Sequence, residues 1–188
     1  MEFLRFPKIP RLNRDIVITE KIDGTNAAVY IHEDGTITAA SKNKFLTPGK
    51  QTDNFGFATW VKQNEEELKK LGPGVHHGEW WGVGIGRGYN LSERRFSLFN
   101  TAKWSDDTAR PKCCYVVPVL YEGPWFMQTT ILPREFAPAV HLLGLTITGS
   151  KAVPGYMKPE GIVVFHKASQ YLFKATVDND AGHKELQS

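Results

Sequence analysis

The sequence predicts an α+β fold built from antiparallel sheets. Segments of strand character outnumber helical ones, and neighbouring strand segments are joined by short turns, as in β-hairpins. Amphipathic periodicity indicates helices over 55–71 and 134–143. The 188 residues, 41% hydrophobic and 23% charged, are typical of a globular protein with a substantial core. We therefore expect residues 1–188 to form a single domain.

The first half of the chain begins with a strand over 15–18 that runs into the segment 19–26. Two further strands, 27–31 and 36–40, are joined by Glu33-Asp34-Gly35, which favours a hairpin turn. The helix over 55–71 has an apolar face and is ended by Gly72-Pro73. A strand over 75–81 follows it.

The second half contains predicted strands at 96–100, 115–120, 161–166 and 171–177. Pro118 interrupts the second of them, because proline has no backbone N–H to donate to a neighbouring strand. The helix over 134–143 is predicted to begin after Pro133 and to end at Gly144, although Pro138 lies within it.

Composition excludes several classes of protein. No apolar run approaches the roughly 20 residues of a membrane-spanning helix, and the N-terminus lacks a secretory signal pattern. Cys113 and Cys114 are adjacent, which rarely permits a structural disulfide, and they lack the partners of a zinc site. We therefore expect a cytoplasmic protein that does not enter a membrane.

The formal net charge of +3 is too small to indicate nucleic-acid binding by itself. Contact with a polyanion would need a local patch. Residues 1–14 are a basic lead-in with two prolines and the cations Arg5, Lys8, Arg11 and Arg14. A solvated arm is the simpler interpretation of this segment, and contact with phosphate is the alternative.

Four glycines alternate with other residues between positions 82 and 88. A dinucleotide-binding loop has similar glycines but lies between a strand and a helix. Here Arg94-Arg95 and another strand follow instead. We therefore reject a dinucleotide fold and expect a mobile connection with arginines near an anion.

Lys21 is the first candidate catalytic residue. In an extended strand Thr19, Lys21 and Asp23 share one side, so an amine lies beside a carboxylate just before Gly24. Such a lysine is either a strand-end partner of an acid or a covalent nucleophile. Glu79, Glu160 and Lys174 lie at the margins of later apolar strands, where a charged side chain needs a partner. If these residues meet Lys21 in one cleft, the covalent nucleophile is the favoured interpretation.

Five segments in order carry this chemistry: Lys21-Ile22-Asp23-Gly24, His77-Gly78-Glu79-Trp80-Trp81, Phe96-Ser97-Leu98-Phe99-Asn100, Glu160-Gly161-Ile162-Val163-Val164 and Leu172-Phe173-Lys174. Together they resemble the motifs of the covalent nucleotidyltransferase superfamily, which contains polynucleotide ligases and mRNA capping enzymes. The resemblance is closest to the RNA ligase 2-like branch. It implies an ATP-grasp-like nucleotidyltransferase core of antiparallel sheets flanked by helices, with the nucleotide between the sheets.

The resemblance also implies catalytic roles for three residues. Lys21 would attack the α-phosphate of ATP and carry AMP as a phosphoramidate. Glu160 would help to hold Mg²⁺ or Mn²⁺. Lys174 would contact the α-phosphate and stabilise the charge of the transition state.

Further residues are expected to bind the nucleotide by the same resemblance. Glu79 would accept a hydrogen bond from the ribose, and Phe99, in preference to Phe96, would stack on adenine. Lys42 occupies a place where relatives usually have an arginine. Glu20, Asp23 and Gly24 flank the nucleophile and complete the expected nucleotide-binding set.

The implied reaction is ligation of nucleic-acid ends, with RNA favoured, through transfer of AMP to a 5′-phosphate and attack by a 3′-hydroxyl. Two departures bear on it. Thr176 replaces the second lysine of the final motif, and no separate C-terminal nucleic-acid-binding domain is expected, so an accessory protein or domain would assist. A DNA ligase or capping-type core, or a non-catalytic module that binds nucleotide or RNA ends, is the alternative.

Overall fold

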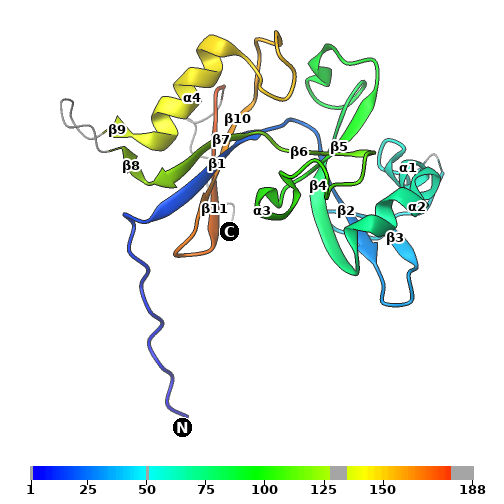
Figure 1. Ribbon diagram of the computed structural model, residues 1–188, viewed down its shortest axis with the longest axis horizontal. Helices are drawn as coiled ribbons and strands as arrows, with labels where there is room; N and C mark the ends of the chain where they lie inside the picture. Colours follow the sequence, from blue (N-terminus) through cyan, green and yellow to red (C-terminus); the bar gives the residue numbers. More distant parts are fainter. Residues whose placement is uncertain (1, 50, 128–134, 179–188) are drawn as a thin grey trace.

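The computed structural model describes residues 2–49, 51–127 and 135–178, and within them it has the predicted α+β architecture. Two sheets lie side by side, each with helices on one face (Figure 1). The first has the order β11-β10-β1-β7 and is antiparallel. Its strands are β1 (Asp15–Lys21), β7 (Val119–Pro124), β10 (Gly161–His166) and β11 (Tyr171–Thr176).

The second sheet has the order β3-β2-β4-β5-β6. Its strands are β2 (Thr25–Ile31), β3 (Ile37–Ser41), β4 (Gly74–Gly82), β5 (Arg94–Leu98) and β6 (Cys114–Val116). Only the β5–β6 pair is parallel among these described strands. A short pair, β8 (Phe126–Met127) with β9 (Glu135–Phe136), lies beside the first sheet (Figure 1).

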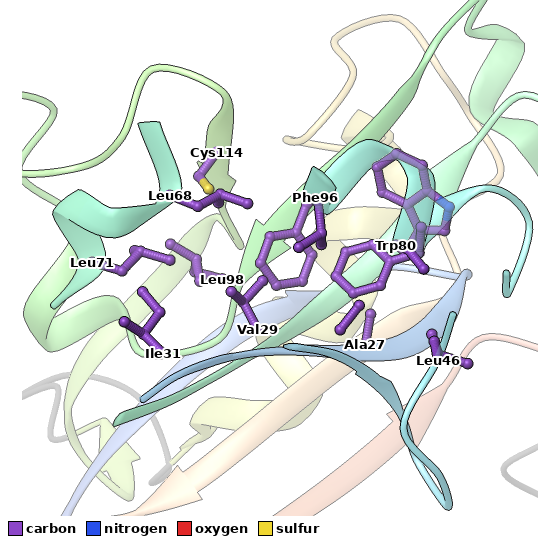
Figure 2. Close-up of a cluster of buried hydrophobic side chains, with 14 of the residues drawn as sticks. Ala27, Val29, Ile31, Leu46, Leu68, Leu71, Trp80, Phe96, Leu98 and Cys114 are labelled. Atoms are coloured by element: carbon purple, nitrogen blue, oxygen red, sulfur yellow. The ribbon is translucent and has the colours of Figure 1, made fainter. Parts of the chain in front are cut away.

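Helices cover one face of each sheet. Helix α4 (Ala137–Thr148) packs on the first sheet, where Leu145 joins a core with Ile16, Ile18 and Ile162. The second sheet is covered by α1 (Phe57–Gln63), α2 (Glu65–Leu68) and the 3-10 turn η1 (Lys69–Leu71). Figure 2 shows the core beneath them, to which alternate residues of β2 contribute one face of the strand.

Two crossovers join the sheets. Residues 22–24 connect β1 to β2, and residues 117–118 connect β6 to β7. A third buried cluster lies at this junction and contains Ile22, Trp81, Tyr89 and Val117. The C-terminal end of β1 is therefore held between the two sheets by apolar packing.

Three predicted elements differ from the structure. The segment 55–71 is interrupted at Asn64, so it forms α1, α2 and η1 instead of one helix. Pro118 separates β6 from β7, which belong to different sheets, so the predicted strand 115–120 is wrong. Helix α4 runs through Gly144 to Thr148 and tolerates Pro138 in its first turn, where the missing N–H is not needed. Residue 134 of that prediction lies outside the described residues.

Two short helices complete the described chain, the 3-10 turn η2 (Gly88–Asn90) and α3 (Thr101–Trp104). None of the helices in the described ranges is long and apolar enough to cross a membrane.

Candidate active site

Lys21 is the last residue of β1 and lies at the junction of the sheets. Ile16, Ile18 and Glu20 of this strand are buried, so the alternation of the strand turns Lys21 and Thr19 to the opposite face. Lys21 Nζ lies 2.6 Å from Glu160 Oε1, with side-chain exposures of 23% and 18%. The amine is therefore held by a carboxylate and remains partly open to solvent.

Glu160 immediately precedes β10, whose Gly161 pairs with Lys21 across the sheet. The close packing of β10 against β11 requires glycine here, since a Cβ on Gly161 would lie 2.1 Å from the carbonyl oxygen of Ala175. One carboxylate oxygen of Glu160, Oε2, is buried and has no hydrogen-bond partner in the described part of the chain. That oxygen is available to a ligand.

Lys174 reaches the same face through the register of the first sheet. Val163 pairs with Thr19 on one side and with Lys174 on the other. Directly paired residues point to the same side of a sheet, so Lys174 shares the face of Thr19 and Lys21. Thr176, which pairs with Gly161, lies level with Lys21.

Glu79 approaches from β4 in the second sheet. It pairs with Asn26 and Ser97, on the strand face opposite the core residues Trp80 and Phe96. Burial raises the pKa of Glu79 to about 7. The positive charge of Lys21 lowers this pKa, and the negative charges of Glu160 and Asp23 raise it further. Glu79 packs against the crossover that follows Lys21, since a Cβ on Gly24 would lie 2.9 Å from Glu79 Cγ.

The two phenylalanines near β5 have different environments. Phe96 is fully buried in the core of the second sheet, whereas Phe99 is 40% exposed. Phe99 follows Ser97 by two residues, and its N–H donates to the carbonyl oxygen of His77, so it continues the face of Glu79. Phe99 is thus open for stacking and Phe96 is not.

Lys42 follows the end of β3, one residue after Ser41, which pairs with Ala27. It is exposed at the end of the hairpin nearest Asn26. The structure thus places Lys42 at the margin of the Glu79 face, where its side chain has no hydrogen-bond or ion-pair partner among the described residues.

Gly24 and Asp23 pack closely at the start of β2. A Cβ on Gly24 would lie 2.6 Å from the carbonyl oxygen of Trp80, so a larger residue would push β2 away from β4. The backbone N–H of Asp23 donates to the Tyr89 hydroxyl at 2.9 Å, and burial raises the pKa of that tyrosine. These contacts hold the turn after Lys21 in one position.

Glu20 lies on the face of β1 opposite Lys21 and is 1% exposed. Its Oε2 accepts hydrogen bonds from the backbone N–H groups of Lys151 and Ala152 at 2.7 and 2.9 Å. This carboxylate therefore anchors the segment before Glu160. The geometry gives no support to the expected contact between the Glu20 side chain and the nucleotide.

Glu160 could hold a divalent metal in an open site, which differs from a site in which protein side chains supply all the ligands. In the described ranges no group of three or more His, Cys, Asp or Glu side chains is arranged to hold a metal ion. Mg²⁺ is commonly bound by one or two carboxylates together with substrate phosphates and water. The unpartnered Oε2 of Glu160 matches that open type of site.

Residues 14–176 match the family model of RNA ligase. The chain belongs to the RNA ligase family. No curated protein matches it. The family match over residues 14–176 confirms the resemblance of the five sequence motifs to RNA ligases.

Solved structures of an RNA ligase from Naegleria gruberi have the same fold as this RNA ligase-family chain. A mutant with AMP and Mn matches at a TM-score of 0.58 and 20% identity, covering 88% of this chain and 50% of that chain. A second mutant, with ATP and Mn, matches at 0.57 and 20%, covering 87% and 50%. The ligase with PPi matches at 0.58 and 22%, covering 87% and 50%. The chain thus spans about half the length of these structures.

Arg87 is a residue of this RNA ligase-family site whose partners are not apparent from the sequence. Its backbone N–H donates to Asp23 Oδ2 at 3.1 Å, and its guanidinium forms ion pairs with Asp23 and Asp178. It also donates to the carbonyl oxygen of Lys158. Asp23 follows Lys21, Lys158 precedes Glu160, and Asp178 follows β11. Arg87, from the loop after β4, therefore joins the second sheet to the first. The signal in the sequence was the glycine-rich loop with arginines expected near an anion. Gly86 leaves no room for a Cβ beside the Asp23 carboxylate.

Replacing Arg87 with alanine is expected to lower the free energy of unfolding by about 1–3 kcal/mol, since charge-assisted hydrogen bonds would be lost. Asp178→Asn should cost less, because Asp178 is 56% exposed and its pairing is screened by solvent. Denaturant unfolding measures both. Equal stability of Arg87→Ala and wild type would show that Arg87 does not join the sheets, and Arg5→Ala, at an exposed position before β1, is the control for loss of an arginine.

Proposed function

We propose that the chain is an ATP-dependent RNA ligase that forms a lysyl-AMP intermediate on Lys21. The observation that supports this most directly is the meeting of two sheets at one amine. Lys21 contacts Glu160 in the first sheet, and the carboxylate of Glu79 in the second sheet is close enough to interact with both. Residues 1–188 would act as one nucleotidyltransferase domain.

In the proposed first step a bond forms between Lys21 Nζ and the α-phosphorus of ATP while the bond to pyrophosphate breaks, and the proton that the amine loses passes to solvent, to which Lys21 is 23% exposed. Glu160 Oε1 orients the amine before nucleotide binds. Lys174 lies on the same face and would contact the phosphate oxygens, which stabilises the charge that develops there. Glu79 and Phe99 would hold the ribose and the adenine.

Glu160 would also hold Mg²⁺ or Mn²⁺ through its unpartnered Oε2. When bound, such an ion neutralises negative charge on the phosphates. Supporting this assignment, structures of the similar Naegleria gruberi ligase contain AMP or ATP with Mn.

The remaining two steps would join RNA ends. AMP would pass from Lys21 to a 5′-phosphate, forming a phosphoanhydride and releasing the lysine. A 3′-hydroxyl would then attack that phosphate and release AMP. We place this reaction in the reducing cytoplasm, where the free thiols Cys113 and Cys114 would stay reduced. An accessory protein or further domain would help to bind the substrate.

Intact mass spectrometry tests the proposal. The wild-type chain is first treated with pyrophosphate to remove any AMP already attached, and is then incubated with Mg²⁺ or Mn²⁺ and either ATP or GTP. A gain of one AMP from ATP alone is expected. Labelling by GTP alone would favour a capping-type enzyme, and nucleotide binding without any mass gain would favour the non-catalytic module. Adenylated protein supplied with 5′-phosphorylated RNA or DNA then identifies the acceptor.

A further inference from the structure

The segment 2–14 before β1, which we call the N-terminal arm, extends away from both sheets (Figure 1). Its apolar side chains are open to solvent: Phe3 is 92% exposed, Phe6 77% and Ile9 74%. Residues 2–11 make no hydrogen bond or ion pair with the described part of the chain. The fold itself therefore gives these side chains no partner.

The arm has a sequence period of three. Apolar residues recur at this period at Phe3, Phe6, Ile9 and Leu12, with Leu4 outside it, and cations recur at Arg5, Lys8, Arg11 and Arg14. A polyproline II helix has three residues per turn, a rise of about 3.1 Å per residue and no internal hydrogen bonds. In that conformation the cations form one stripe, about 9 Å apart, and the apolar residues form a second. Pro7 and Pro10 favour it by restricting the backbone.

The charge of the chain is concentrated in the arm. Residues 2–14 contain four cations and one acid, Glu2, and the rest of the chain contains 19 basic and 19 acidic residues. The whole formal net charge of +3 therefore belongs to the arm. A partner with negative charge in a regular line matches the cationic stripe, and exposed rings match a partner with stacking surfaces. Single-stranded RNA has both features.

The base of the arm is fixed at the end of β1 opposite Lys21. The carbonyl oxygen of Leu12 accepts a hydrogen bond from the ring of His166 at 2.8 Å, and that of Arg14 accepts one from the N–H of Trp125. Strand β1 then leads from Asp15 to Lys21, a path of about 20 Å at the rise of a strand. An RNA strand with its end at Lys21 would thus reach the arm only after it spans the length of β1.

We propose that the N-terminal arm binds the single-stranded RNA that leads to the reacting end, with its cationic stripe on the phosphates and its apolar stripe on the bases. This inference extends the proposed function by naming the surface that engages the RNA. All of the arm except Arg14 lies before the residues, 14–176, that match the RNA ligase family. It therefore adds to the chain a binding element outside the matched region.

The test compares binding to 5′-phosphorylated single-stranded RNA of about 20 nucleotides, longer than the site size of a typical single-strand-binding fold. The arm variant is Arg5→Gln/Lys8→Gln/Arg11→Gln. The matched control, Lys62→Gln/Lys70→Gln/Lys112→Gln, removes the same charge from exposed positions around the second sheet. A second variant, Phe3→Ser/Phe6→Ser, leaves the charge unchanged.

Affinity is measured as a function of salt. Each phosphate contact adds about 0.7 to the slope of log affinity against log salt for a single strand, so loss of three contacts should reduce the slope by about 2. Between 50 and 200 mM salt, the fold loss of RNA affinity should then be about 20 times smaller for the arm variant than for wild type. The control should keep the wild-type slope, and the phenylalanine variant should bind more weakly at an unchanged slope.

An unchanged slope in the arm variant would overturn the proposal. So would unchanged RNA affinity together with a change in oligomeric mass, which would assign the arm to a second copy of the chain. Self-adenylation is measured in parallel by intact mass and should be unaffected by the arm variant. If wild type fails to adenylate but binds RNA through the arm, the proposed function fails and the assignment of the arm stands.

Discussion

Replacement of Lys21 by alanine is expected to abolish covalent attachment of AMP, a loss of at least about 10³-fold in the rate of adenylation. Lys21 Nζ is the amine held at the junction by Glu160 at 2.6 Å. Lys174 cannot replace it, because it lies two strands away on β11. Intact mass after incubation with ATP and Mg²⁺ or Mn²⁺ measures the loss.

Lys21→Arg is the matched variant for this experiment. Arginine keeps the positive charge and can pair with Glu160, but its guanidinium stays protonated and is not a nucleophile. Both variants should therefore lack AMP, while Lys21→Arg stays closer to wild type in thermal stability because Glu160 keeps a counter-ion. Attachment of AMP to Lys21→Arg would show that the nucleophile is another residue.

Replacement of Glu79 by glutamine is expected to stabilise the nucleotide-free protein above pH 7 by about 2–3 kcal/mol. Burial raises the pKa of Glu79 from 4.5 to about 7. Each unit of pKa difference between folded and unfolded states corresponds to about 1.4 kcal/mol, and partial exposure to solvent reduces the total. Ionised Glu79 therefore costs stability that glutamine would restore.

The sign of this effect depends on pH. Between pH 4.5 and about 7 the folded protein binds the Glu79 proton more tightly than the unfolded chain does. The contribution of Glu79 to stability therefore falls as pH rises through this window and is most unfavourable above it. The advantage of Glu79→Gln should be near zero at pH 4.5 and full at pH 8.

Denaturant unfolding of wild type and Glu79→Gln at several pH values measures this difference. Glu33→Gln, at an exposed hairpin turn, is the control for loss of one acid. Glu79→Gln should bind AMP more weakly despite its greater stability, because the amide is a poorer acceptor for a ribose hydroxyl than a carboxylate. A difference in stability that does not vary with pH would contradict the raised pKa of Glu79.

Much of the site follows from local sequence patterns. The alternation of a strand predicts that Lys21 and Thr19 share a face, and glycine beside a charged residue predicts a close approach of backbones. The order of the five motifs was enough to indicate the family that the match over residues 14–176 shows. The hairpin of β2 and β3 was also predictable, because its turn residues are adjacent in the chain.

Contacts between distant segments required the tertiary structure. The sequence placed Glu20 with the nucleotide-binding residues, but its carboxylate binds the backbone of Lys151 and Ala152, more than a hundred positions away. Arg87 likewise reaches Asp23 and Asp178 only because the two sheets meet. No periodicity within either segment encodes these partners.

The sequence by itself determined most of the strands, the family and the side of β1 on which Lys21 lies, because these depend on residues close together in the chain. Only the tertiary structure decided that Phe96 is core and Phe99 is open, and that Pro118 sends the chain from one sheet to the other. Burial and sheet membership depend on which distant surfaces pack together. The raised pKa of Glu79 has the same origin, since it reflects burial at the junction of two sheets.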